Sequence, residues 1–292
     1  MNVLVATDGS KYGQWGLNWV AKLPFVKPPR VMALHVLDNA WLRLPFRTRL
    51  EVQRMEARAA NTLRRAKQQL TSLKLKGTAR KEQGSVAQTI LKRASPRDGL
   101  LVVGSQGLDA LDRFMLGSIS AKLVQYATCP VLVVKSEALA LRRIALAIDG
   151  SEASAKALEF VVSTFRPNLP TRMGRRVPIH VSVIYVIARR PLAPITIGST
   201  IPWVEYRERK VNETGRKLLI QSVQKLVAAG FTAEPLCQSG NPAERIMSGA
   251  TKHHADLIVM GAKGLTAVDR FLLGSVSTRV VQHAKGSVLV VR

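Results

Sequence analysis

The chain of 292 residues contains an internal repeat. The segment Gly104–Ser120 (GSQGLDALDRFMLGSIS) returns without a gap as Gly261–Ser277 (GAKGLTAVDRFLLGSVS), 157 positions later. A second matching pair, ATDGS from Ala6 and AIDGS from Ala147, lies 141 positions apart. Two matches in the same order indicate a duplication, and the second copy holds about 16 extra residues between its anchors, some of them around Thr171–Pro178.

Short apolar runs alternate with helical patterns in both copies. The expected strands are Val3–Ala6, Val31–Val36, Thr78–Gln83, Leu100–Val103 and Val131–Val134, then Ile144–Ile148, Ile179–Val186, Thr232–Cys237, Leu257–Met260 and Val288–Val291. The expected helices of the first copy cover about Lys11–Leu23, Arg47–Leu73, Val86–Ala94 and Ser118–Ala127. This alternation predicts an α/β fold of two Rossmann-like domains, residues 1–138 and 139–292, each a five-stranded parallel sheet with helices on both faces.

Composition excludes several classes of protein. No apolar run approaches the roughly 20 residues of a membrane span, and the first residues are typical of a strand, so we expect neither a transmembrane segment nor a signal peptide. Cys129 and Cys237 are the only cysteines, too few for a disulfide framework or a metal cluster. A cytoplasmic protein is expected.

The formal net charge is +25, and it is spread over the whole chain. Residues 1–140 hold 22 basic and 9 acidic residues, and the remainder holds 22 and 10. Such a field attracts anions of any kind. The basic stretch Arg43–Arg80 is typical of a solvated helix face. The alternative is a surface that docks acidic partners, a membrane surface or nucleic acid, although no interleaved aromatic residues mark a nucleic-acid module.

Two loops in each copy directly follow strands, where ligands of open parallel sheets bind. The first is Asp8-Gly9-Ser10, repeated as Asp149-Gly150-Ser151. Its serines are suited either to cap the next helix or to bind a ligand. Asp149 comes one position past its expected strand and Asp8 two positions past, which aims both at the crevice.

The second loop is Gly-x2-Gly, nine residues, then Gly-Ser. It runs from Gly104 to Ser118 and again from Gly261 to Ser275. The first glycines are expected to adopt conformations closed to other residues and to let a ligand approach closely. The Gly-Ser pair opens a helix whose free amides favour an anion. Ser118, Ser120, Ser275 and Ser277 can add hydroxyl hydrogen bonds to phosphate. A capped helix after a glycine turn, without any ligand, is the alternative.

This pattern resembles the universal stress protein family, whose ATP-binding motif is Gly-x2-Gly-x9-Gly-Ser with an aspartate after the first strand. The resemblance implies an adenine nucleotide such as ATP in each copy, accompanied by Mg or Mn that takes no ligand directly from the protein. In the first copy it assigns binding to Thr7, Asp8, Ser10, Val36, Gly104, Gly107, Gly117, Ser118 and Ile119. In the second it assigns Ile148, Asp149, Ser151, Val186, Gly261, Lys263, Gly264, Gly274, Ser275 and Val276.

The resemblance also implies that the last strands pair within the chain as a pseudo-dimer, which could associate further into a homodimer. The second copy follows the family pattern more closely: it keeps Gly240-Asn241-Pro242 and Asp256, and Lys263 stands where the first copy has Gln106. We therefore expect tighter nucleotide binding there. The expected function is a nucleotide-binding stress or signalling protein rather than an enzyme. The alternatives are a slow ATPase or autokinase, and a basic scaffold with empty pockets.

Overall fold

The structure of the chain, a computed structural model, describes residues 1–39, 48–94, 99–107, 116–137, 140–170, 176–188, 201–265 and 273–292, and for 201–212 it describes the backbone alone. Most of the nine-residue stretch inside each glycine motif, namely 108–115 and 266–272, lies outside these ranges, as do the insertion residues 171–175.

Each half repeats the same order of strands and helices. The first half comprises β1 (Asn2–Ala6), α1 (Lys11–Lys22), β2 (Arg30–Asp38), α3 (Arg49–Ser72), β3 (Gly77–Gly84), α4 (Val86–Arg93), β4 (Gly99–Gly104), α5 (Ser118–Tyr126) and β5 (Val131–Val134). The second comprises β6 (Arg143–Ile148), α6 (Glu152–Thr164), β7 (Asn168–Pro170), β8 (Arg176–Pro178), β9 (His180–Ala188), α7 (Ile201–Ala228), β10 (Thr232–Gly240), α8 (Pro242–Lys252), β11 (Leu257–Gly261), α9 (Ser275–His283) and β12 (Ser287–Val291). Part of the extra sequence of the second copy forms the β7–β8 hairpin.

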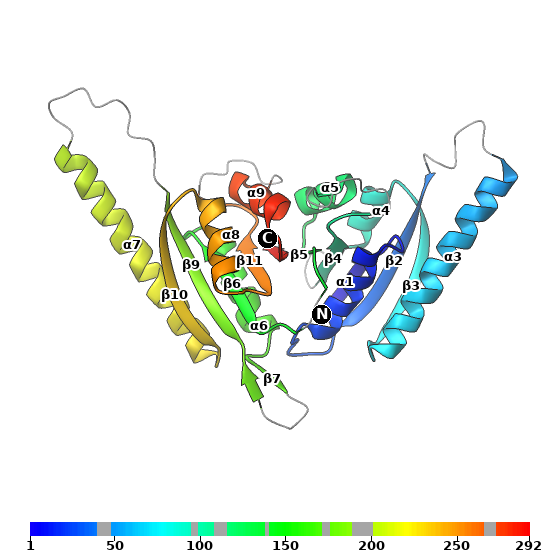
Figure 1. Ribbon diagram of the computed structural model, residues 1–292, viewed down its shortest axis with the longest axis horizontal. Coiled ribbons are helices and arrows are strands. Elements are labelled where there is room, and N and C mark those ends of the chain that lie inside the picture. The colour runs from blue at the N-terminus through cyan, green and yellow to red at the C-terminus, as the bar shows by residue number, and fades with distance from the viewer. Residues whose placement is uncertain are drawn as a thin grey trace.

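The ten long strands form one continuous sheet in the order β10-β9-β6-β11-β12-β5-β4-β1-β2-β3. In this ten-stranded sheet, pairing within each half is parallel throughout, which confirms the predicted fold. The halves join where β5 and β12 pair antiparallel, with Leu132 opposite Leu289. The last strands therefore pair within the chain, as expected, and Figure 1 shows this seam at the centre of the molecule.

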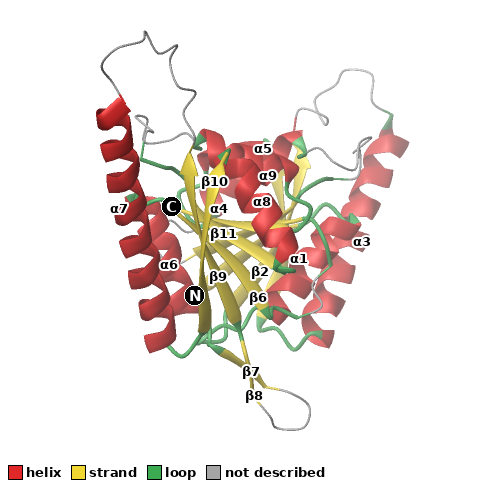
Figure 2. Cartoon of the chain, turned by 60° about the vertical axis from the view of Figure 1, so that its left-hand side comes forward, coloured by secondary structure: helices red, strands yellow, loops and turns green. Residues whose placement is uncertain are grey.

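Two apolar cores cover the two faces of the sheet. One packs α1, α3, α6 and α7 against it, and the other packs α4, α5, α8 and α9. Each core contains buried residues from both halves, because the sheet beneath it crosses the seam. Figure 2 shows the helices arranged around the twisted strands. The two halves thus share their hydrophobic cores.

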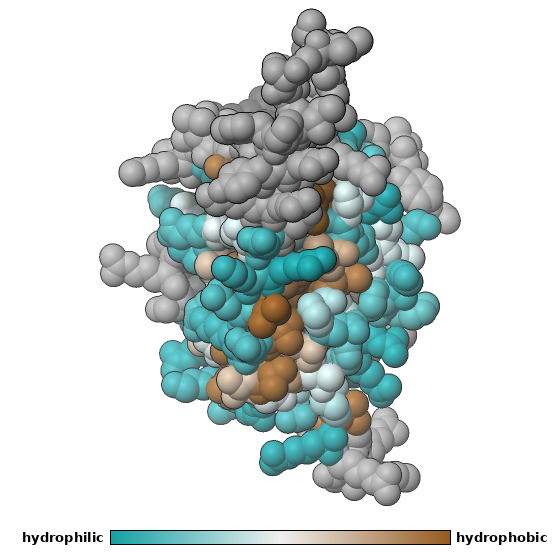
Figure 3. All heavy atoms as spheres, turned by 90° about the vertical axis from the view of Figure 1, so that its left-hand side faces the viewer, coloured by the Kyte–Doolittle hydropathy of each residue, from teal (hydrophilic) through white to brown (hydrophobic). Residues whose placement is uncertain are grey.

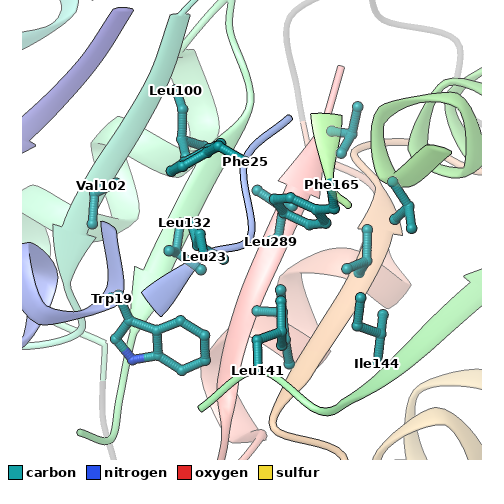
Figure 4. Packing of buried hydrophobic residues seen from close by; sticks show 14 of the residues in the cluster. Trp19, Leu23, Phe25, Leu100, Val102, Leu132, Leu141, Ile144, Phe165 and Leu289 are labelled. Carbon is teal, nitrogen blue, oxygen red and sulfur yellow. The ribbon is translucent and has the colours of Figure 1, made fainter. Parts of the chain in front are cut away.

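Equivalent segments after α1 and α6 also meet at the seam. Phe25 and Phe165 form an antiparallel bridge, and their ring centroids lie 6.1 Å apart. The amide of Val26 donates to the carbonyl of Thr164 at 2.9 Å. Figure 4 shows both phenylalanines in one apolar cluster with Leu132 and Leu289. Because large buried aromatic side chains contribute strongly to packing, this contact reinforces the strand pairing.

The two longest helices lie at the outer sides of the molecule (Figure 1). Helix α3 begins with a capping box, in which Thr48 and Glu51 exchange side-chain and backbone hydrogen bonds. Helix α7 lies on the side that faces the reader in Figure 3, where apolar atoms form a strip between hydrophilic ones. Ile220 and Val227 are exposed large apolar side chains of α7. No helix within the described residues is long and apolar enough to cross a membrane.

Candidate functional site

The order of the strands brings the aspartate loop and the glycine loop of each copy together at one edge of the sheet. Strands β1 and β4 are neighbours, as are β6 and β11, although β2 and β3 separate the first pair in sequence and β9 and β10 the second. Here the strand order reverses, which creates a crevice at the carboxyl ends of the strands. Asp8 follows β1, and the glycine loop begins at Gly104, the last residue of β4, and continues to Gly107, so both loops border that crevice. Asp149 and Gly261–Gly264 do the same in the second half.

The aspartate loops have the same geometry in both halves. Gly9 and Gly150 have φ angles of +88° and +86°, which glycine adopts readily and other residues rarely do. One oxygen of each preceding aspartate, Oδ1, accepts from the amide of Ser10 or Ser151 at 2.9 Å. These loops are therefore rigid turns between strand and helix.

Ser10 and Ser151 are N-cap residues. The Oγ of Ser10 accepts from the amide of Gly13 at 3.3 Å, and that of Ser151 accepts from Ser154 at 3.2 Å. Both serines are buried. Their hydroxyls start α1 and α6, which is the capping role given above as the alternative to ligand binding.

The second oxygen of each aspartate points at a loop glycine. A β-carbon added to Gly107 would lie 2.8 Å from Oδ2 of Asp8, and one added to Gly264 would lie 2.7 Å from Oδ2 of Asp149. A side chain on either glycine would displace the carboxylate. The absence of a β-carbon therefore keeps the aspartate and the backbone of the glycine loop side by side.

Gly104 and Gly261, the first glycines of the motif, serve helix packing, and the expectation that the loop glycines adopt backbone conformations closed to other residues was wrong. Gly104, Gly107, Gly261 and Gly264 are all absent from the positive-φ residues of the described chain. A β-carbon on Gly104 would lie 2.6 Å from Cβ of Tyr12, and one on Gly261 would lie 2.6 Å from the backbone of Ala153. At these two positions glycine lets the start of α1 or α6 pack on the end of a strand.

Helices α5 and α9 begin beside the same loops with uncapped amides. Their N-cap residues, Gly117 and Gly274, make no side-chain capping hydrogen bond. The amide of Gly117 donates to the carbonyl of Ser105 at 2.8 Å, and that of Gly274 donates to Ala262 at 2.8 Å, which fixes the helix start next to the loop. Ser118 and Ser275 are exposed. An exposed helix start with free amides is suited to bind an anion.

The hydroxyls of Ser120 and Ser277 were expected to be available for phosphate, but both bind backbone carbonyls instead. The hydroxyl of Ser120 donates to the carbonyl of Gly104 at 2.6 Å, and that of Ser277 donates to the carbonyl of Gly261 at 2.9 Å. Both serines are buried, because they lie on the helix side that packs on the sheet. They tie α5 and α9 to the ends of β4 and β11. Ile119 and Val276 pack against the core, so they offer a ligand their backbone amides.

The remaining predicted residues lie around this edge, and Thr7 contacts the aspartate loop directly, because its Oγ1 accepts from the amide of Gly9 at 3.3 Å. Thr7 and Ile148 end or follow their strands and are buried, which leaves mainly backbone for a ligand. Val36 lies on β2, two residues beyond the last residue of β2 that pairs with β1. Val186 lies on β9, one residue beyond the last residue of β9 that pairs with β6. The structure thus brings the aspartate, the glycine loop and the helix start together, with the valines beside them.

The two halves differ at a position that the sequence reasoning missed. His35 on β2 corresponds to Tyr185 on β9, both directly before the predicted valine. The Nδ1 of His35 is 2.8 Å from the carbonyl of Thr7, to which it donates in the tautomer that this contact requires. Burial raises the pKa of Tyr185, and electrostatic interactions with Cys237 and Asp149 act in the same direction. Comparing the aligned copies position by position would have found this difference.

A polar cavity of about 300 Å³ lies at the opposite edge, by the amino ends of β6, β9 and β10, lined by Arg143, His180, Ser182, Glu234, His253 and His254. Desolvation pushes the pKa of Glu234 upward, but the hydrogen bond from Ser182 and the charges of His253 and His180 outweigh it, so the pKa is lowered. The Nδ1 of His253 lies 2.8 Å from Glu234. This cluster ties the end of α8 to β10, and it lies away from the predicted site.

Comparison with known proteins assigns the family. The model of the universal stress protein family matches residues 1–135 and again residues 140–292. The chain belongs to the universal stress protein family. A universal stress protein of Mycolicibacterium smegmatis is 30% identical over 310 aligned positions, covering 99% of this chain and 96% of that protein.

Further relatives show how the tandem chain is related to shorter ones. Universal stress protein YxiE of Bacillus subtilis is 30% identical over 152 residues, covering 98% of its own length but 51% of this chain. Among solved structures, a universal stress protein from Archaeoglobus fulgidus covers 100% of this chain with a TM-score of 0.69 and 20% identity. That likeness supports the fold of the whole tandem chain.

Proposed function

We propose that each half of this tandem universal stress protein binds an adenine nucleotide such as ATP, and that occupancy of the sites tunes the conformation of the chain or its choice of partners. The phosphates would lie at the starts of α5 and α9, on the amides of Ser118 and Ile119 and of Ser275 and Val276. Asp8 and Asp149 would contact the adenosine. The backbones of Val36 and Val186 would meet the adenine edge.

One observation carries this proposal: in both halves a carboxylate, a glycine loop without a β-carbon and an uncapped helix start converge at the same sheet edge. The helix start offers amide donors and the positive end of the helix dipole to phosphate. The aspartate supplies an acceptor for hydroxyl groups such as those of a ribose. A cradle of this composition fits a ligand that is anionic at one end and polar at the other.

We propose that a Mg²⁺ or Mn²⁺ ion accompanying the nucleotide takes its ligands from phosphate oxygens and water. The described residues contain no group of three or more His, Cys, Asp or Glu side chains suited to hold a metal. Such an ion would neutralise phosphate charge, and Mg²⁺ commonly keeps several waters when it binds through phosphates. The protein would then contact the ion only through the nucleotide.

We propose binding rather than turnover as the main activity. Efficient phosphoryl transfer requires a group that positions the attacking water or hydroxyl and a cation at the transferred phosphate. Lys263 is such a cation in the second half, but its equivalent in the first half, Gln106, is a buried neutral side chain. Single-turnover measurement of bound ATP tests this point: conversion within minutes would favour a slow ATPase.

Two measurements test nucleotide binding. Mass analysis of small molecules released by heat from the purified chain would identify what it retains, and we expect adenine nucleotides. Calorimetric titration with ATP should show two sites in the wild type, one in Gly117→Asp or Gly274→Asp, and none in the double variant. A wild-type chain that releases no nucleotide and gives no heat with ATP, ADP or AMP would refute the proposal.

A second role is supported by the outer face of α3. Arg54, Arg58 and Arg65 are exposed and lie on one side of the helix, since they are spaced by four and seven residues, and Lys67 is exposed on another side. We propose that this face docks an acidic protein, since clustered exposed cations favour anionic partners. Binding to an acidic peptide should weaken steeply with salt and fall when Arg58 and Arg65 become glutamine. Stronger binding to unrelated DNA duplexes than to the peptide would point to nucleic acid instead.

A further inference from the structure

A lysine of the first half holds the end of a helix in the second half. Lys135 directly follows β5, and its Nζ donates to the carbonyls of Gln282 at 3.0 Å and Ala284 at 2.7 Å. These carbonyls belong to the C-terminal end of α9, whose C-cap residue is Ala284. The last carbonyls of a helix have no partner within the helix. Lys135 therefore satisfies them from across the seam.

An arginine of the second half makes the reciprocal contact. Arg292 directly follows β12, and its Nη2 donates to the carbonyls of Val124 and Gln125, the latter at 2.8 Å, at the end of α5. Lys135 and Arg292 are 157 positions apart, the spacing of the glycine motif, so they are equivalent positions of the repeat. The pair of contacts obeys the same pseudo-two-fold symmetry as the paired strands β5 and β12.

Each of these helices thus connects the two halves. Its N-terminal end borders the phosphate cradle of its own half, and its C-terminal end is held by a cation of the other half. A cation at the C-terminal end of a helix is electrostatically favourable, as is an anion at the N-terminal end. Both α5 and α9 have nine residues, so a rotation or shift at one end moves the other end by a comparable amount.

We propose that Lys135 and Arg292 are crossed positioning residues: Lys135 of the first half sets the nucleotide site of the second, and Arg292 of the second half sets the site of the first. The inference rests on the proposed nucleotide binding. Each cation anchors the far end of the helix whose first amides bind phosphate. Ligand affinity in one half therefore depends on a residue of the other half, which contacts no ligand.

A merely structural role would give a different pattern. A cation that only stabilises the seam would weaken both sites equally when it is removed, or would lower stability without changing affinity. A residue that acts on the ligand directly would weaken the site of its own half. The crossed pattern is specific to positioning through the helix.

The experiment uses the full chain with one site inactivated. Gly117→Asp leaves the second site, and Gly274→Asp leaves the first. Both glycines have extended backbone angles that aspartate adopts, so the folds should persist. Lys135→Met, Arg292→Met and the conservative Lys135→Arg are introduced into each background. Arg279→Met and Lys285→Met are the controls. Each removes an exposed cation, on α9 in the first case and two residues beyond its end in the second.

Calorimetry with ATP then reads each site separately. Lys135→Met should weaken binding about 3- to 30-fold in the Gly117→Asp background and less than about 2-fold in the Gly274→Asp background, and Arg292→Met should give the reverse. Lys135→Arg should restore most of the affinity. Equal losses in both backgrounds, losses confined to the half that carries the substitution, or losses matched by the controls would overturn the inference.

A measurement without ligand separates this inference from the proposed function. Amide chemical shifts in the ligand-free chain should change at Ser275 and Val276 with Lys135→Met, and at Ser118 and Ile119 with Arg292→Met. Unchanged shifts at these first-turn amides overturn positioning even where ATP binds. A wild-type chain that binds no nucleotide refutes the proposed function, while the crossed shift pattern still decides whether each cation sets the opposite helix start.

Discussion

In the second half, Oδ2 of Asp149 lies 2.7 Å from the point that a β-carbon on Gly264 would occupy. Because the obstacle is the end of a side chain, Gly264→Ala should fold and yet move the carboxylate. We expect affinity for ATP at the second site to fall about 10-fold, corresponding to about 1.4 kcal/mol, if Asp149 contacts the nucleotide. Isothermal calorimetry measures this change.

The matched control for that substitution is Gly286→Ala. A β-carbon there has one neighbour, at 3.9 Å, and the residue precedes β12 at the other edge of the sheet. Its binding should equal that of the wild type. An unchanged affinity in Gly264→Ala would show that the aspartate does not contribute to the site.

Replacing Gly261 by alanine should lower the stability of the fold. Its added β-carbon would meet backbone atoms of Ala153 at 2.6 Å, which can move only with α6. We expect Gly261→Ala to lower the free energy of unfolding by about 1–3 kcal/mol, the usual effect of overpacking. Urea denaturation measures it, with Gly274→Ala as the comparison because its nearest contacts are ordinary at 3.4 Å. Equal stabilities of the two variants would contradict the packing role.

The two sites should differ in strength. Lys263 adds a partly exposed cation to the second loop, whereas Gln106 in the first is neutral. One such charge is worth about 0.5–1 kcal/mol, so the second site should bind ATP about 2- to 5-fold more tightly. Titration of Gly117→Asp and Gly274→Asp compares them, and Lys263→Gln should abolish the difference. Tighter binding in the first half would reverse this expectation.

Stability should depend on pH through Lys135. Burial lowers the pKa of this lysine to about 8 from its ordinary 10.5. Between about pH 8 and 10.5 this lysine is protonated in the unfolded chain but has lost its proton in the folded chain. Its contribution to the free energy of unfolding therefore rises as pH increases from about 8 towards 10.5. The difference in unfolding free energy between wild type and Lys135→Met, measured at several pH values, should grow in that window. Parallel curves would contradict the lowered pKa.

Much of the fold could be predicted because the repeat constrained it. Strand ranges such as Val131–Val134 and the pairing of the last strands agree with the structure, since alternating apolar runs and a duplicated motif are local signals. The packing role of Gly104 and Gly261 could not be predicted from these signals, because it depends on where α1 and α6 pack. The buried orientation of Ser120 has the same origin: a serine in a first helical turn is equally suited to either side.

The cross-seam cations had a signal that motif analysis alone does not use. Lys135 and Arg292 occupy equivalent places just after the last matched strands, yet each is one basic residue among 44. Only the antiparallel pairing of β5 with β12 shows that each points into the opposite half. Such partners become visible when tertiary geometry is known.

The antiparallel pairing of β5 with β12 within one polypeptide has a consequence for how the two halves assemble and diverge. In a dimer of separate single-domain chains, assembly follows protein concentration and every substitution appears twice. Here the effective concentration of one half for the other is set by the covalent connection and does not fall on dilution. Each half is also free to diverge alone, as His35 and Tyr185 already do, so one molecule can carry two unequal sites in a fixed ratio of one to one.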